Sequence, residues 1–219
     1  IALPNIILNT AVAEVFSQFA DKLEKADDFD ATLATLIRET FTAHERILFN
    51  GNGYSDEWRE EAARRGLLNL ATSPEAFDCM DADKNLKLFT EHGIMSEAEV
   101  RSRKEILFEN YAKTVNIEAL TMIDMAKKDI LPAVSRYCGD LARDMASKKA
   151  VGCPCKADAA NLEGISAGVD RLYDLCQTLK SELASVPKQN IDAANYFSSI
   201  IVPAMDAVRA EADALELLT

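Results

Sequence analysis

The chain lacks the positive charge that binding to nucleic acid requires. Its 24 lysines and arginines are outnumbered by 36 aspartates and glutamates, which gives a formal net charge of −12 and a sequence pI of about 4.7. An acidic surface repels the phosphate backbone and disfavours contact with anionic membrane surfaces for the same reason. We therefore predict partners that are neither nucleic acid nor membrane.

Long hydrophobic runs and a disulfide framework are missing as well. No apolar run reaches the roughly 20 residues that a membrane helix needs. The apolar opening is interrupted at Pro4 and Asn5 and has no basic region, so a signal peptide is a poor interpretation of it. The 5 cysteines are odd in number and scattered, which predicts reduced thiols and a cytoplasmic protein. Because the chain begins at Ile1 rather than Met, we expect it to be a piece of a longer protein.

Strand patterns are absent, and helical periodicity runs through the chain. Residues 1–95 are expected to form a compact group of shorter helices. Ser55 is suited to cap a helix that ends at Gly66, and Ser73 and Pro74 to begin a short helix as N-cap and first residue. Another helix should end at Gly93, and ERILF (residues 45–49) is predicted to be a short extended piece.

Long helices are expected over residues 96–219, where Ser96 and Glu99 form a capping box. Pro132 is the only breaker before about residue 149 and should kink the helix, at a cost of about 3 kcal/mol. Three segments repeat apolar residues at alternating spacings of three and four, the pattern of a coiled-coil-like seam. These residues are Leu131, Val134, Cys138, Leu141, Met145, Leu162, Ile165, Val169, Leu172, Cys176, Leu179, Leu183, Val186, Ile201, Met205, Val208, Ala212 and Leu215. We predict an all-α fold, with a long antiparallel helical bundle that shares one continuous core with the first part.

Two residue pairs could carry metal or acid–base chemistry. Cys153 and Cys155 form a CxC turn that could bind a soft metal. A structural zinc site needs about four ligands, and no others lie nearby in sequence, so free surface thiols are favoured. His44 and His92 are the only histidines, and each is expected at a helix end, where a cation stabilises the helix by about 0.3–1 kcal/mol. A structural role is favoured for both.

Charged residues on the expected helices could also face a site. Glu118, Asp124 and Asp129 are candidates, but on a long helix of an acidic protein a solvated face is the favoured interpretation. The charges between Glu57 and Arg65 suit exposed pairs four residues apart. We therefore assign no catalytic, cofactor-binding or metal-ligating residue to this chain.

The stretch FNGNGYSDEW, residues 49–58, places two glycines beside aromatic residues in a chain otherwise poor in glycine. A phosphate-binding P-loop needs G-x-x-x-x-G-K-[ST] between a strand and a helix. Here the spacing is G-x-G, and no lysine follows. We predict a structural turn in which Gly51 and Gly53 adopt positive φ, while Tyr54 and Trp58 pin the turn to the core.

Six stretches of the sequence, taken in order, form a specific set. They are PNIILNTAVAE (4–14), HERILFNGNGYSDEW (44–58), RRGLLNL (64–70), HGIMSEAEVRSRKEI (92–106), YAKTVNIEALTMIDMAKKDILPAV (111–134) and IVPAMDAVRAEADALELL (201–218). Together they resemble the C-terminal part of type III glutamine synthetases. The resemblance covers about residues 1 to 145, weakens across the CxC turn, and returns near the end.

The resemblance implies a parent glutamate–ammonia ligase, which makes glutamine from glutamate, ammonia and ATP through γ-glutamyl phosphate, with divalent magnesium or manganese. It implies a cytosolic double-ring homo-oligomer whose catalytic residues lie upstream on a sheet-rich domain. This chain would then be a structural and assembly domain, inactive alone, whose partners are that catalytic domain and neighbouring subunits. Two other classes stay open: a non-enzymatic helical module that binds a partner helix along its seam, and a metal or redox module built on Cys153 and Cys155.

Overall fold

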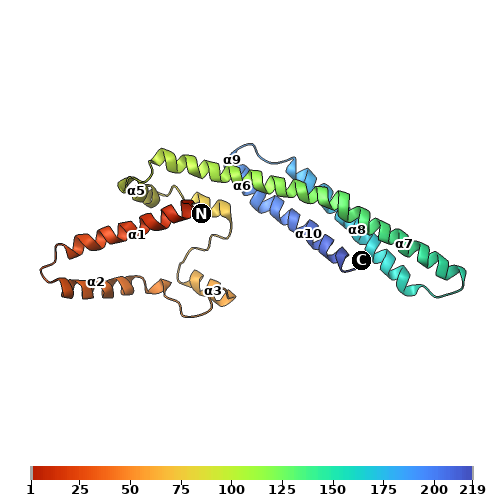
Figure 1. The fold of residues 1–219 in the computed structure, drawn as a ribbon, viewed down its shortest axis with the longest axis horizontal. Helices are drawn as coiled ribbons and strands as arrows, with labels where there is room; N and C mark the ends of the chain where they lie inside the picture. Colours follow the sequence, from red (N-terminus) through yellow and green to blue (C-terminus); the bar gives the residue numbers. More distant parts are fainter. Residues whose placement is uncertain (1, 219) are drawn as a thin grey trace. The chain divides into compact units, whose positions relative to one another are not determined.

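A computed structural model describes residues 2–218 and is all-α over that range, as the periodicity predicts (Figure 1). The chain divides into two compact units, with the boundary between Lys104 and Glu105. None of the helices that the structure describes is both long and apolar enough to cross a membrane. The expectation of one core shared by the two parts of the chain stays a prediction.

The first unit consists of short helices and the beginning of a long one. Helix α1 packs against α2 and α5, and α1 and α2 run in opposite directions as a hairpin (Figure 1). The bounds of the elements are α1 (Ala2–Leu23), α2 (Phe29–Ala43), the 3-10 turn η1 (Glu45–Ile47), α3 (Asp56–Arg64), α4 (Ser73–Asp78), α5 (Asp83–Glu91) and α6 (Glu97–Met125).

Most of the helix ends in this unit follow local side-chain chemistry. Ser55 accepts a hydrogen bond from the Trp58 N–H, which confirms the predicted cap of α3. The capping box of Ser96 and Glu99 at the start of α6 is confirmed as well. Gly66 and Gly93 follow α3 and α5 with φ of 68° and 61°. This left-handed conformation costs glycine little, and it ends both helices where the sequence predicts.

Two local predictions in this unit are wrong. The N-cap of α4 is Thr72 rather than Ser73, because Thr72 and Glu75 exchange hydrogen bonds in a capping box, and Pro74 is then the second helical residue. The first three residues of ERILF form a 3-10 turn rather than an extended piece, and Leu48 after them has an extended backbone. The Leu48 N–H donates to the Glu45 carbonyl three residues back, at 3.0 Å, so the backbone satisfies its hydrogen bonds locally.

The disturbance expected at Pro132 takes the form of a π-helical turn. Helix α6 continues through η2 (Ala126–Ile130) into α7 (Leu131–Ala150), and the Leu131 N–H donates to the Ala126 carbonyl five residues back. A second π-turn, η3 (Phe197–Ile201), precedes Pro203 in the same way. Proline has no N–H and its ring clashes with the carbonyl four residues back, so a wider turn just before it relieves both problems.

The second unit is the predicted antiparallel bundle. Helix α8 (Lys156–Leu183) packs along α7 on one side and along α10 (Val202–Glu216) on the other, and the short α9 (Asn190–Tyr196) leads into η3 (Figure 1). Three fully buried side chains of α8 lie seven residues apart, and three more from the η3–α10 segment match them. They are Ile165, Leu172, Leu179, Ile201, Val208 and Leu215. The predicted seam is confirmed at these positions, where burying each side chain contributes about 1.5–3 kcal/mol.

A buried glycine allows α8 and α10 to approach closely. A Cβ atom added at Gly168 would lie 2.6 Å from Cδ2 of Leu215 and 3.2 Å from Oε1 of Glu211. Gly164, one turn earlier on the same helix, is exposed and has open space around its Cα. The two glycines therefore play different roles, although the sequence does not distinguish them.

Candidate functional site

Helix α1 exposes a stripe of large apolar side chains. Leu8, Val12, Val15 and Phe16 follow the spacing that places residues on one side of a helix, and between 43% and 67% of each is exposed. The only buried residue that the structure describes in α1 is Thr10, whose hydroxyl donates to the Ile6 carbonyl at 2.7 Å. A helix with this composition normally lies inside a larger protein.

Helix α2 carries a second stripe of the same kind. Phe29, Ile37 and Phe41 lie on one side of it and are 49% to 61% exposed, whereas Leu36 is buried. Single exposed apolar residues are ordinary, but contiguous rows of them mark interaction surfaces. We call these rows the α1 stripe (Leu8, Val12, Val15 and Phe16) and the α2 stripe (Phe29, Ile37 and Phe41). They are the strongest candidates for docking sites in the first unit.

A hydrogen bond between side chains fixes α1 on α5. Nε2 of His92, at the end of α5, lies 2.7 Å from a carboxylate oxygen of Glu14. The same carboxylate accepts a 2.6 Å hydrogen bond from Gln18. These two contacts, with that of Gln18 the larger, hold the pKa of Glu14 below its ordinary value of 4.5. Sequence reasoning assigned His92 a helix-end role but missed this partner, because 78 residues separate the two.

The Glu14 contact should make the docking of α1 dependent on pH. A carboxylate with a lowered folded-state pKa contributes its full stabilisation above the ordinary pKa, and loses it as pH falls through the folded value. We expect Glu14→Gln to lower the melting temperature at pH 7, and the difference from the unsubstituted chain to shrink as the pH falls below about 4.5 and the Glu14 carboxylate is protonated. Scanning calorimetry across this range measures it, with Glu24→Gln as the exposed control. A difference that is constant with pH would contradict the prediction.

Phe49, rather than Tyr54, anchors the turn at residues 49–58. Its ring stacks on Trp58 with centroids 4.2 Å apart, whereas Tyr54 is 94% exposed, so the predicted role of Tyr54 is wrong. The Tyr54 N–H donates to the Asn52 side chain at 3.1 Å, a local turn that does not need the tyrosine ring. Arg65 completes the anchor, because its guanidinium lies 5.8 Å from the Trp58 centroid and donates to the Leu48 carbonyl.

The two glycines of this turn do not adopt the predicted positive φ. The positive-φ glycines in the part of the chain that the structure describes are Gly66, Gly93 and Gly152. Gly51 instead gives room to an aromatic ring, since a Cβ there would lie 2.6 Å from Cζ of Phe49. Gly53 has nothing within 4 Å of its added Cβ, so a side chain at this position meets no steric obstacle.

Substitution at Gly51 should therefore loosen the turn, and substitution at Gly53 should not. We expect Gly51→Ala to cost about 1 kcal/mol by displacing the Phe49 ring, and Gly53→Ala to stay within about 0.5 kcal/mol of zero. Trp58 is the single tryptophan, so its fluorescence in urea titrations reports on this turn directly. Equal effects of the two substitutions would show that the ring contact does not hold the turn.

A polar cleft beside the turn is lined by three arginines, two of which share one carboxylate partner. Arg46, Arg64 and Arg65 line about 520 Å³ of space. Both Arg64 and Arg65 bind the Glu61 carboxylate, which lowers its pKa to about 2. Arg65 also donates to the backbone carbonyl of Arg46. The arrangement supports the structural interpretation of the turn, because Arg65 links the C-terminal end of α3 to the backbone of the preceding segment.

The CxC turn is only partly exposed. Cys153 is exposed, but Cys155 is buried, so the prediction of free surface thiols is wrong for Cys155. Gly152 has φ of 79° after α7, and this turns the chain back so that the Cys155 thiol lies 3.7 Å from the Met145 carbonyl. Within residues 2–218, no group of three or more His, Cys, Asp and Glu side chains is placed to hold a metal ion.

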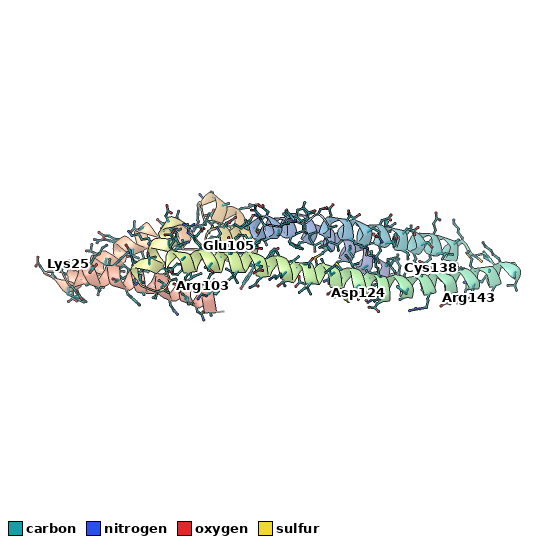
Figure 2. All side chains as sticks on the ribbon, turned by 90° about the horizontal axis from the view of Figure 1, so that it is seen from above. Lys25, Arg103, Glu105, Asp124, Cys138 and Arg143 are labelled. Carbon is teal, nitrogen blue, oxygen red and sulfur yellow. The ribbon has the colours of Figure 1, made fainter. Side chains whose placement is uncertain are left out.

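The other candidate residues are dispersed. His44 is exposed at the end of α2. Glu118, Asp124 and Asp129 are exposed along α6 and η2, and Asp124 binds Lys128 at 2.8 Å, in agreement with a solvated face. Figure 2 shows Asp124 on the long helical segment of the second unit that also carries Arg143. The structure therefore brings none of these side chains together into a catalytic constellation among the residues it describes.

Comparisons with known proteins give one consistent result. The family profile of the glutamine synthetase C-terminal domain matches residues 32–149. The chain is 36% identical to a glutamine synthetase of Butyrivibrio fibrisolvens, with 88% of this chain and 28% of that protein aligned. It is 32% identical to the type-3 glutamine synthetase of Dictyostelium discoideum, with 97% of this chain and 30% of that protein aligned. The chain thus spans less than a third of the length of these relatives.

Proposed function

Since this chain belongs to the glutamine synthetase family, we propose that it is the helical assembly domain of a type III enzyme. The resemblance read from the six ordered stretches is confirmed at the level of the family. In this proposal the domain binds other parts of the enzyme and takes no direct part in the reaction. The non-enzymatic interaction module and the metal or redox module gain no support from the comparisons.

The observation that carries this proposal is the pair of apolar stripes on α1 and α2. Their side chains are 43% to 67% exposed although they have the composition of core residues. The relatives are more than three times as long as the aligned region, so they contain ample chain to cover such surfaces. We assign the stripes to contacts with the catalytic domain of the same chain and with neighbouring subunits of a homo-oligomer.

The parent enzyme is proposed to catalyse the ATP-dependent ligation of ammonia to glutamate in the cytoplasm. The γ-carboxylate of glutamate attacks the terminal phosphorus of ATP and releases ADP. Ammonia then attacks the γ-carbonyl carbon and displaces phosphate. Magnesium or manganese is expected to serve the phosphoryl transfer. No residue of this chain is assigned to either step, and its role is to hold the assembly in which the steps occur.

An activity assay on two proteins tests the proposal. The isolated chain is expected to form no glutamine from glutamate, ammonia, ATP and magnesium, because its sequence carries no motif that binds a nucleotide or a metal ion. A longer protein that also contains the preceding catalytic region is expected to be active. Turnover by the isolated chain would contradict the assembly role. Inactivity of the longer protein would instead favour the non-enzymatic interaction module.

A further inference from the structure

The second unit contains an open apolar groove that the proposed assembly role does not explain. Two adjacent hollows of about 470 and 420 Å³ share Ile130, Ala212 and Asp213 as lining residues. The groove therefore runs along α6, η2 and the start of α7 on one wall and along α10 on the other. On the first wall it extends from Ile117 to Val134, which at 1.5 Å per residue is roughly 25 Å.

The groove exists because one side of the bundle is not covered. Helix α8 packs along both α7 and α10, whereas no extensive contact joins α6 to α10 in the part of the chain that the structure describes. Ile117 and Met125 consequently remain 63% and 54% exposed, although they face the groove. A fourth helix placed between these walls would convert the arrangement into a four-helix bundle.

The chemistry of the walls selects one kind of occupant. Three of the lining residues are methionines, Met122, Met125 and Met205, whose flexible side chains adapt to irregular apolar surfaces. The acidic lining residues are Glu118, Asp129, Asp213 and Glu216. Among the described residues that line the groove, Arg209 is the only basic one. Its Nε atom lies 3.4 Å from a carboxylate oxygen of Asp213. The groove is therefore apolar with an excess of negative charge.

We infer that this groove binds an amphipathic helix from another polypeptide, with apolar residues on one side flanked by lysine or arginine. Apolar anchors at spacings of three and four would enter between the methionines, and the basic flanks would meet the acidic residues. A second copy of this chain is a poor occupant, because both surfaces carry negative charge and the chain has a net charge of −12. The inference is independent of the α1 and α2 stripes, which lie in the first unit.

A leucine–lysine peptide of roughly 15 residues, with leucine at spacings of three and four, tests the inference. We expect it to bind the 219-residue chain with a Kd of about 10 µM or tighter. The same peptide with glutamate in place of lysine should bind at least about tenfold more weakly. Fluorescence anisotropy of labelled peptides, titrated at two salt concentrations, measures both affinities.

Three charge-matched variants distinguish the groove from general attraction to an acidic protein. Ile117→Arg and Met125→Arg place a cation in the groove, whereas Leu120→Arg adds the same charge to an exposed position of α6 outside it. All three side chains are more than half exposed, so folding should be retained, and circular dichroism checks this. We expect the first two variants to bind the leucine–lysine peptide at least about tenfold more weakly, and Leu120→Arg to bind within about twofold of the unsubstituted chain.

Methyl NMR of the 6 methionines locates the bound peptide. Signals of Met122, Met125 and Met205 should shift, while those of Met80, Met95 and Met145 should not. Equal weakening by Leu120→Arg, or shifts confined to the second set of methionines, would overturn the inference. So would dimerisation through the groove, seen as a dimer that Met125→Arg dissociates in sedimentation velocity. A simple alkane that binds in the groove and is not displaced by the peptide would overturn the inference as well.

Discussion

An enzyme that carries Leu8→Asp together with Phe16→Asp is expected to fail to assemble, while the isolated chain with the same changes should fold normally. In the isolated chain the two side chains are 65% and 67% exposed, so charge is tolerated. In the proposed assembly they are buried, and removing a charge from water costs several kcal/mol per ion. The population of assembled enzyme should therefore fall by more than about 100-fold.

Sedimentation velocity and glutamine synthesis by the whole enzyme measure this result. The matched control is Ala13→Asp with Ser17→Asp, which adds the same charge to exposed positions of α1 outside the α1 stripe. The control should assemble and retain activity. An assembled, active stripe variant would show that the α1 stripe faces solvent in the enzyme and that the assembly proposal assigns the wrong surface.

Gly168→Leu is expected to destabilise the bundle. The new Cβ would lie 2.6 Å from Leu215 Cδ2, so α8 and α10 must separate or repack. Overpacking costs about 1–3 kcal/mol, from which the gain in helix propensity over glycine, about 1 kcal/mol, is subtracted. We expect a net loss of up to about 2 kcal/mol, equivalent to a melting temperature lower by up to roughly 4–8 °C at this size.

Gly164→Ala is the matched control for this change. It lies on the same helix with open space around it, and should stabilise the chain by about 0.5–1 kcal/mol through helix propensity alone. Urea unfolding of both variants gives the comparison. Combining Gly168→Leu with Leu215→Ala should cost less than the sum of the two single changes, because the removed side chain makes room. Strict additivity would mean that the close approach at Gly168 is not the cause.

Interactions within one turn of helix were predictable from the sequence. The caps at Ser55 and Ser96 and the helix-ending glycines Gly66 and Gly93 involve partners three to six residues away, so residue types and spacing suffice. The bundle seam was predictable for a related reason, since a repeated spacing shows which side of each helix must be buried. The error at Ser73 concerns two adjacent residues that can both cap a helix. Thr72 is the N-cap because a glutamate, Glu75, follows it three positions later.

Features that depend on distant partners were not predictable. The bond from His92 to Glu14 and the stacking of Phe49 on Trp58 require knowledge of how helices pack. The burial of Cys155 depends on how the chain turns back toward α7. The α1 and α2 stripes were missed for a different reason: apolar periodicity identifies a face that will be covered, but does not say whether the cover comes from the same stretch of chain.

The π-turn η2 also changes how the sequence of the long helix should be aligned with its neighbours. One row of buried alanines recurs every seven positions, at Ala112 and Ala119 of α6 and Ala126 of η2, and the next buried residue along the chain is Val134, eight positions on. The extra residue falls inside η2, where the wider turn accommodates it. The wider turn thus absorbs one extra residue, so that the side chains beyond it still face the core of the bundle. Homologous helices that differ by one residue here can share the same bundle core, and an alignment should place that gap within Ala126–Ile130.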